Sequence, residues 1–325
     1  MAVKRVVSLL PSAAEIVSLI IDNNPSVQLV GRSHEDDYPP SVNTLPILTA
    51  PKTKFTTSAD VDVQVSNLLA EGNSLYTLDT ALLKSLRPDI VITQDLCTVC
   101  SIDLVTVQRI AKQIDPEPTI VTLNPLSIED VISSISDVGK ALGMIEESSR
   151  AISMLRSRIN HARDLVNRSI ASGRKRSKVA FFEWTSPIYL GGHWTPQLIR
   201  WSNGIQVLAD CKDGDTAEMG APPSVRVPPE DVIREKPEIL IICPCGLNLD
   251  ATRKEYEETL LPSNWWPPLA KCASKIALVD GNQSFDQLIS IQIKGLVDAL
   301  EWLVGYINDI PEIIPKNFPW ENLKS

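Results

Sequence analysis

Short apolar runs alternate with amphipathic stretches along the first 145 residues of the chain. Four runs predict strands: Val6–Leu10, which has the pattern of a fully buried strand, Val27–Gly31, Ile90–Thr93 and Thr119–Leu123. Stretches with apolar residues three or four positions apart predict helices: Pro11–Ile21, Ala59–Ala70, Thr80–Leu86, Val105–Ile114 and a helix that begins after Ser127. Ser12 is placed to cap the first helix. The alternation predicts a parallel sheet with helices on both faces.

The middle of the chain has a different pattern. Residues 146–170 contain no Pro or Gly and carry apolar residues at helical spacing. They predict one amphipathic helix of some 25 residues, roughly 38 Å long, which ends at Ser172 and Gly173. A second alternating pattern follows, with strands at Val179–Glu183, Ile205–Leu208, Ile239–Cys243 and Ile276–Val279, the last of which closes the sheet. Its helices are Pro196–Trp201, Pro228–Arg234, Asp250–Leu260 and a final one at Ile289–Ile307.

These patterns predict an α/β protein with two Rossmann-like lobes, a single long backbone helix that joins them and a ligand cleft between them. The predicted parts are an N-terminal lobe at 1–145, the connecting helix at 146–173, a C-terminal lobe at 174–288 and a C-terminal helix and tail at 289–325. A helical connection, unlike flexible strands, predicts limited hinge motion between the lobes.

Composition narrows the range of partners. The 325 residues suffice for two domains, and the net charge of −9 argues against nucleic acid, which needs clustered Lys and Arg. No apolar stretch approaches the roughly 18 residues that a membrane span requires. The apolar run after Lys4 and Arg5 is too short for a signal sequence, which predicts a cytosolic protein unless a leader was removed and Met1 added. Cys97 and Cys100 could form a redox dithiol, although ordinary thiols explain them as well.

Polar and aromatic residues follow the predicted strands, at the carboxyl ends where open α/β sheets bind ligands. The candidate ligand-binding residues are Ser12, His34, Tyr38, Gln94 and Asp95 in the first lobe and Glu183, Trp184, His193, Trp194, Cys245 and Asn282 in the second. Aromatic residues make up only 5% of the chain, so their presence in these loops indicates a bulky, partly apolar ligand.

The two histidines in these loops allow more than one chemistry. His34 and His193, one in each lobe, could hold a divalent metal together with Glu35 or Asp37. Each could equally contact an organic ligand or form a hydrogen bond within its loop. His34 could also form an acid–base pair with Asp95 or Glu183 across the cleft, as an enzyme would require. The chain has no G-x-S-x-G, H-E-x-x-H, P-loop or G-x-G-x-x-G motif, which favours a binding protein but leaves catalysis open.

Several motifs, in order along the chain, resemble those of one family. Arg5–Ile16 is similar to the first strand and helix of the helical-backbone (class III) substrate-binding proteins that serve ABC importers of cobalamin and iron siderophores. Further motifs resemble cobalamin-binding-like members: Gly31–Pro39, Leu86–Cys100, Glu183-Trp184, Gly192–Pro196, Pro244–Gly246 and Asp280–Asn282. The resemblance covers roughly residues 3 to 305. Where these members usually have Cys after His-Glu, this chain has Asp36, and Gln283–Gln287 replaces an aromatic residue and an Arg-Pro pair.

The resemblance implies a protein that binds a corrinoid or similar chelate between its lobes and works, in some members, with an ABC permease. It implies that Tyr38, Trp184, His193 and Trp194 form aromatic and imidazole walls, and that Gln94 and Asp95 make polar contacts. The expected function is therefore binding of a bulky chelate-type ligand, and the candidate cofactors are a corrinoid such as cobalamin and a divalent metal. The alternative is a metal-dependent or acid–base enzyme that reuses the same cleft.

Overall fold

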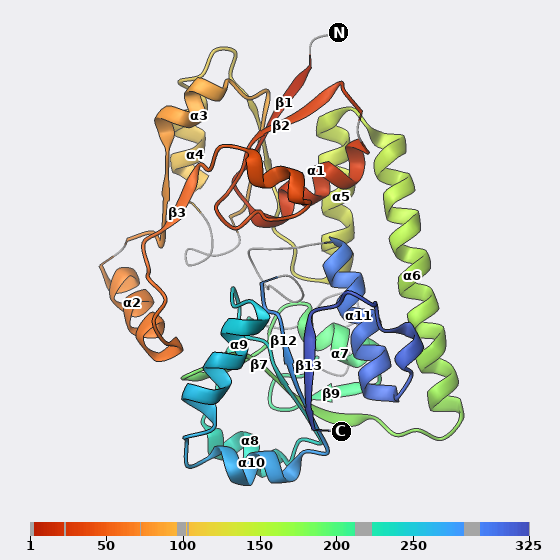
Figure 1. The fold of residues 1–325 in the computed structure, drawn as a ribbon. Helices are drawn as coiled ribbons and strands as arrows, with labels where there is room; N and C mark the ends of the chain where they lie inside the picture. The colour runs from red at the N-terminus through yellow and green to blue at the C-terminus, as the bar shows by residue number, and fades with distance from the viewer. Residues whose placement is uncertain are drawn as a thin grey trace.

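The computed structural model describes residues 3–22, 24–71, 73–95, 102, 104–211, 223–282 and 293–324, without the side chains of residues 11, 12, 293 and 294. Two α/β lobes lie one above the other, and the long helix α6 runs along one side of both (Figure 1). The predicted fold class, two lobes joined by a helical backbone, is confirmed.

The N-terminal lobe is built on a parallel sheet of order β2-β1-β5-β6. Its strands are β1 (Lys4–Ser8), β2 (Val27–Gly31), β5 (Ile90–Thr93) and β6 (Thr119–Thr122). Its helices are α1 (Pro11–Ile21), η1 (Pro40–Thr44), α3 (Thr80–Leu86), α4 (Leu104–Ala111) and α5 (Ile128–Leu142). Val6 packs in one apolar cluster with α1 and α5, and the next residue, Val7, packs in another on the opposite face with α3 and α4. Helices therefore cover both faces of the sheet, as predicted.

The beginning of α1 differs from the prediction. Leu10 occupies the N-cap position without a side-chain cap, and Pro11 follows in the first turn. Ser12 therefore lies inside the helix rather than at its cap. A proline at this position is well suited to a helix start, because its missing N–H would have no partner there and its φ is already helical.

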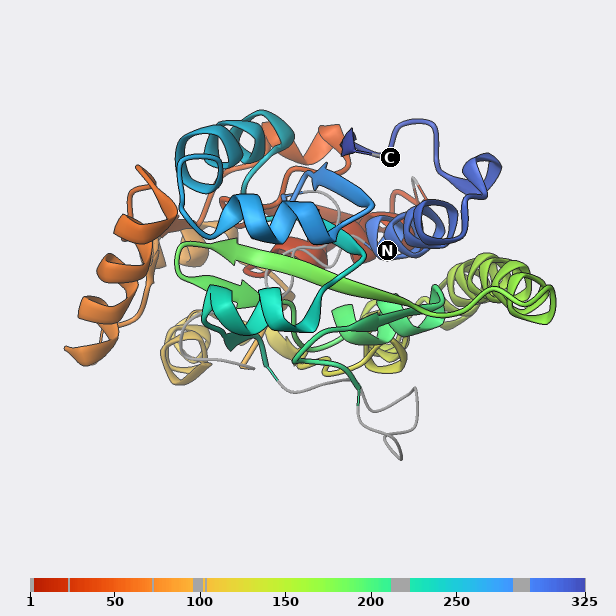
Figure 2. The same ribbon diagram turned by 90° about the horizontal axis from the view of Figure 1, so that it is seen from below.

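An arm leaves the N-terminal lobe on the side opposite α6 (Figure 2). It consists of a two-stranded antiparallel ribbon, β3 (Thr49–Pro51) and β4 (Tyr76–Leu78), and of α2 (Ser58–Ala70) between those strands. The sequence pattern predicted the helix but not the ribbon, because three-residue strands are too short to show a period. We refer to residues 49–78 as the arm.

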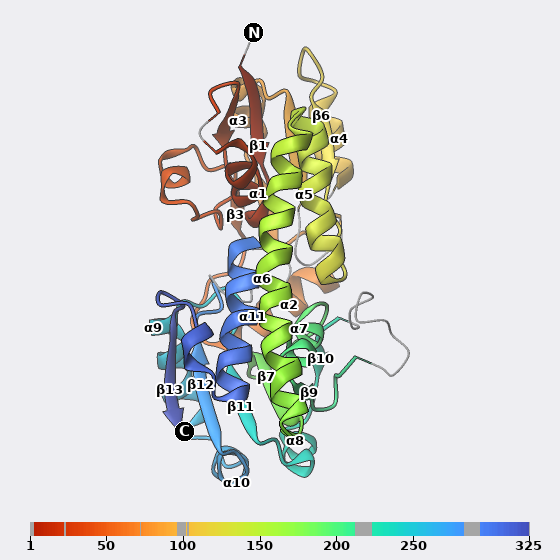
Figure 3. The same cartoon turned by 90° about the vertical axis from the view of Figure 1, so that its right-hand side faces the viewer.

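Helix α6 (Ile145–Ala171) joins the two lobes over 27 residues, close to the predicted span. Its buried face packs against α1 and α5 above and against α11 (Ile293–Asn308) below (Figure 3). Arg158 forms ion pairs with Asp298 at 2.5 Å and with Glu301 at 2.6 Å, which hold α6 against α11. One apolar cluster thus runs through both lobes along the backbone helix, and this supports the expected stiffness of the connection.

The C-terminal lobe has a mixed sheet of order β10-β8-β7-β11-β12-β13, with β9 paired to β7. Its strands are β7 (Ser177–Thr185), β8 (Ile188–Leu190), β9 (Gly204–Gln206), β10 (Val225–Arg226), β11 (Ile239–Ile242), β12 (Lys275–Val279) and β13 (Trp320–Lys324). Its helices, besides α11, are α7 (Thr195–Trp201), α8 (Pro229–Glu235), α9 (Leu249–Glu255), the π-helix η2 (Tyr256–Leu260), α10 (Trp266–Cys272) and the 3-10 turn η3 (Pro311–Ile313). Strands β7, β11 and β12 are parallel, so their carboxyl ends lie at one edge.

The position of strand β12 in this sheet differs from the prediction. Strand β12 does not close the sheet, because the tail strand β13 pairs with it in antiparallel orientation. The aromatic residues of the tail hold it there: Trp302 on α11 stacks on Phe318 with ring centroids 5.3 Å apart and meets Trp320 edge-to-face at 5.6 Å. Within the described stretches, no helix is long and apolar enough to cross a membrane.

Candidate ligand site between the lobes

Away from the arm, two hydrogen bonds cross from the N-terminal lobe to the C-terminal lobe. The Asn282 side chain, in the loop after β12, donates from Nδ2 to Oδ2 of Asp37 in the loop after β2 at 3.0 Å. The backbone N–H of Ile128, at the beginning of α5, donates to Oε1 of Gln197 on α7 at 3.0 Å. The first bond joins strand-end loops and the second joins helices, so segments that are far apart in the sequence meet between the lobes.

Gln94 follows β5 directly and is only 1% exposed. Neither its side-chain oxygen nor its side-chain nitrogen has a hydrogen-bond partner in the described structure. Burial of an unpaired amide costs about 1–3 kcal/mol in proteins, and most buried polar groups avoid that cost by pairing. An amide left unpaired at a strand end of this kind is typical of a position that contacts a ligand.

His193 lies in the C-terminal lobe, in the loop between β8 and α7, the helix whose Gln197 accepts the hydrogen bond from Ile128. It is 4% exposed, and its Nδ1 has no hydrogen-bond partner among the described residues. Its φ of 50° places a residue other than glycine in the left-handed region, which costs backbone energy. Burial lowers the pKa of His193, so the ring is neutral near pH 7. A neutral imidazole can hydrogen-bond a ligand or coordinate a metal centre within one.

The four side chains that were expected as cleft walls take different positions. Trp194 is 2% exposed and belongs to the apolar cluster of the backbone helix, so its indole packs in the core. Trp184 is half-buried against the arm, where its Nε1 donates to the carbonyl of Ser58 at 3.1 Å and its ring meets Phe55 edge-to-face at 6.5 Å. Tyr38 is 36% exposed. Among these four, His193 is the side chain with a buried atom left unpaired.

His34 lies at the base of the arm. Its Nδ1 is 2.6 Å from Oγ1 of Thr49 on β3, and its ring centroid is 5.5 Å from that of Tyr76 on β4. Burial, followed by the nearby Arg32 charge, lowers the pKa of His34 to about 4. These contacts explain His34 as a residue that fixes the arm. Over the part of the chain that the structure describes, no three His, Cys, Asp or Glu side chains converge as a metal site would require, so the His34–His193 metal hypothesis gains no support.

Asp36, the departure from the family motif, is fully buried in the loop after β2. Burial raises the pKa of its carboxyl to about 7, although the Ser33 N–H, which donates to Oδ2 at 2.9 Å, acts in the opposite direction. The Arg32 guanidinium donates to the carbonyl of Asp36 at 2.7 Å. The loop is therefore held by its own residues, and Asp36 has a structural role there.

The remaining predicted residues come from both lobes and differ in exposure. Glu183 is 9% exposed and accepts a hydrogen bond from Ser224 at 2.6 Å, and the Cys245 N–H donates to the Glu183 carbonyl at 3.0 Å. Asp95 is exposed, and its N–H donates to the side chain of Asn124 at 2.8 Å. The Ser12 side chain, Cys97, Cys100 and Gln283–Gln287 lie outside the described residues, so the predictions on them stay predictions.

Sequence reasoning missed a buried network that ties the arm to the C-terminal lobe. Thr185, at the end of β7, donates to Oε1 of Glu255 at 2.6 Å, and Ser58 on α2 donates to the same oxygen. The two hydroxyl oxygens are 3.0 Å apart. All three side chains are less than 5% exposed. No local pattern could show this network, because Ser58 and Thr185 are 127 positions apart in the sequence.

Several solved structures are similar to this chain over almost its whole length. A periplasmic heme-binding protein from Pseudomonas aeruginosa has 17% identity and a TM-score of 0.66, with 99% of this chain and 98% of that one covered. The periplasmic vitamin B12-binding protein BtuF of Vibrio cholerae has 16% identity and a TM-score of 0.60, with 94% and 97% covered. An ABC transporter substrate-binding protein from Listeria monocytogenes has 14% identity and a TM-score of 0.60, with 94% and 99% covered.

The chain therefore has the two-lobed, helical-backbone fold of the class III periplasmic binding proteins, the family that its sequence motifs resemble. The sequence itself matches no family model and none of the curated proteins compared with it. Two of the solved structures are described as periplasmic, so the expectation of a cytosolic protein finds no support in them.

Proposed function

We propose that this protein binds a bulky tetrapyrrole-type chelate, such as heme or a corrinoid, between its lobes and catalyses no reaction on it. The observation that carries the proposal is the pair of buried, unpaired polar groups on opposite lobes, the amide of Gln94 and Nδ1 of His193. A ligand that reaches both would satisfy donors and acceptors whose burial is otherwise unfavourable. The heme and vitamin B12 binding described for two fold neighbours supports this ligand class.

The chemistry of His193 suits a ligand with a metal at its centre. Because burial keeps its imidazole neutral, a ring nitrogen can coordinate iron or cobalt without first losing a proton. The metal would then arrive within the chelate, so the protein needs no cluster of ligands of its own. An acid–base enzyme is less favoured, because His34 is held by Thr49 at the base of the arm.

The same comparison favours a site of action outside the cytoplasm and an ABC permease as partner, as the descriptions of the fold neighbours suggest. Cell fractionation with an antibody against the protein tests the location. Recovery in the cytosolic fraction alone would remove the importer from the proposal and leave ligand binding to be judged separately.

Titration of the purified protein with hemin and with aquocobalamin, followed by absorption spectroscopy, tests the proposal. The wild-type protein should bind at least one of them saturably, with a spectral change from axial coordination that His193→Leu abolishes. Gln94→Leu should weaken the affinity about tenfold, the effect of roughly 1.4 kcal/mol expected for one buried hydrogen bond. His161→Leu is the matched control, because His161 is exposed on α6. Binding of neither chelate, or equal binding by all variants, would refute the proposal.

A further inference from the structure

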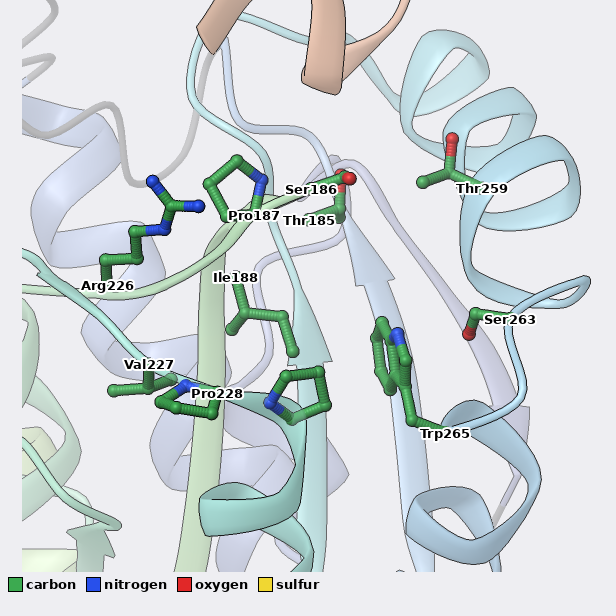
Figure 4. A pocket seen from close by; sticks show the side chains of 11 residues that line it. Thr185, Ser186, Pro187, Ile188, Arg226, Val227, Pro228, Thr259, Ser263 and Trp265 are labelled. Carbon is green, nitrogen blue, oxygen red and sulfur yellow. The ribbon is translucent and has the colours of Figure 1, made fainter.

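A cavity of about 630 Å³ lies in the C-terminal lobe, apart from the site just described. Its walls come from the turn between β7 and β8, from the segment that leads from β10 into α8, and from the region between η2 and α10 (Figure 4). Neither Gln94 nor His193 lines it. It opens at the carboxyl end of β7, the edge at which open α/β sheets bind ligands, and its size falls in the range of small-molecule sites.

The walls of this cavity are mostly apolar. The Trp265 indole stands on one side, and Ile188 and Pro228 form the floor and the opposite side (Figure 4). Hydroxyl groups, among them Ser263 and Thr259, lie along the wall near η2. A flat apolar body would bury its faces against the indole and the proline rings, and surfaces of this kind favour aromatic rings.

Among the described residues that line the cavity, Arg226 is the one that carries a charge, and none is acidic. It belongs to β10, next to Tyr189 on β8, and lies across the cavity from Trp265 (Figure 4). The hydroxyl of Tyr189 interacts with both Arg226 and Asp62 of α2, so the arm helps to fix this corner. A planar guanidinium at the edge of an apolar wall is suited to a carboxylate, which it binds through two parallel hydrogen bonds.

We propose that this cavity is a second ligand site, for a flat aromatic molecule that carries one carboxylate. The carboxylate pairs with Arg226 while the ring lies against Trp265 and Pro228. Heme and corrinoids do not fit this assignment, because the described residues of the lining include no His, Tyr, Cys or Met to coordinate their metal. The site is independent of the proposed function, since none of its residues belongs to the strand ends that carry Gln94 and His193.

Isothermal titration of the full chain with 2-naphthoate and with its neutral counterpart 2-naphthalenemethanol tests the assignment. The anion should bind saturably and at least tenfold more tightly than the alcohol. Arg226→Gln should remove this preference without weakening the alcohol, and Trp265→Leu should weaken both probes. Arg234→Gln is the matched control, because Arg234 on α8 pairs with Asp231 and does not line the cavity.

Three outcomes would overturn the inference: no saturable binding of 2-naphthoate, equal binding of the neutral alcohol, or an unchanged preference in Arg226→Gln. If Trp265→Leu does not fold, Arg226→Gln still decides the question, because Arg226 is exposed and its loss leaves the apolar core intact. Gln94→Leu should leave naphthoate binding unchanged, so failure of this site and failure of the inter-lobe site give different results.

Discussion

A single buried carboxylate takes part in the contact between the arm and the C-terminal lobe. Glu255 is 4% exposed and accepts hydrogen bonds at the same oxygen from Thr185 of its own lobe and from Ser58 of the arm. Each hydroxyl has one hydrogen, so a hydroxyl that donates to the carboxylate does not also donate to the other hydroxyl, although the two oxygens are within hydrogen-bond distance. Replacement of Thr185 by Val keeps the shape of the side chain and removes one of the two donors.

The size of the effect follows from the burial of this network. A hydrogen bond to a charged group contributes about 1.5–3 kcal/mol, and the loss of a donor leaves the carboxylate partly unsatisfied. We expect Thr185→Val to lower the free energy of unfolding by about 2 kcal/mol. Because the carboxylate also holds Ser58, the arm should detach more often, and amide exchange in α2 should rise by up to about 30-fold.

Urea unfolding and hydrogen exchange of α2 measure the two effects. Thr93→Val is the matched control, because Thr93 is also buried, at 1% exposed, while its hydroxyl has no hydrogen-bond partner in the described structure. That variant should be neutral or slightly stabilising, with unchanged exchange in α2. If Thr185→Val and Thr93→Val shift the urea midpoint equally and leave α2 equally protected, the network does not hold the arm.

Two buried titratable side chains and one closely packed glycine give further predictions on stability. Burial raises the pKa of Asp36 from 3.8 to about 7, so the folded state keeps a proton that the unfolded state releases, and stability from this group falls as the pH rises from about 4 to 7. Asp36→Asn should therefore stabilise the protein at pH 8 and flatten that fall in urea titrations. Burial and the charge of Arg32 lower the pKa of His34 from 6.5 to about 4. The stability that this group contributes is therefore present above pH 6.5 and is lost as the pH falls from 6.5 to 4. At pH 5, His34→Gln should remove about 1–2 kcal/mol of the loss in unfolding free energy that acid causes. An unchanged fall of the unfolding free energy between pH 6.5 and 4 would contradict this. Gly281→Ala should destabilise the protein by more than about 2 kcal/mol in thermal unfolding, since its added carbon would lie 2.0 Å from the carbonyl oxygen of Pro244. In the control Gly246→Ala the added carbon meets no atom within 4 Å, so this variant measures the cost of a positive φ alone.

The sequence predicted well those elements in which one spacing of apolar residues repeats over many positions. Helix α6 could be predicted almost to its ends, because its uninterrupted apolar stripe follows one rule over 27 residues. The strands of the N-terminal sheet were predicted from short apolar runs, although the edge strand β6 has no buried residue. Strand β13 and the arm ribbon were missed, because they are short and partly exposed, and because pairing with distant strands, rather than their own pattern, defines them.

The candidate site stays a prediction, but two of its residues have a feature that the sequence could not show. Gln94 and His193 both carry buried side-chain atoms without a hydrogen-bond partner in the described structure. Residue type alone could not separate a wall from a core side chain, so Trp194 was expected at the ligand although it packs among the helices. The position of His34 depends on Thr49, which approaches it only after the arm has formed.

Hydrogen exchange of the protein with and without a bound chelate tests most directly whether the ligand lies between the lobes. With hemin or aquocobalamin at saturating concentration, we expect added protection in both lobes, in peptides that contain residues 92–95 of the N-terminal lobe and residues 191–197 of the C-terminal lobe. Gln94→Leu should reduce the protection in both regions together. Protection of one lobe alone, or protection centred on residues 185–188 and 226–229 around the second cavity, would contradict a ligand held between the strand ends.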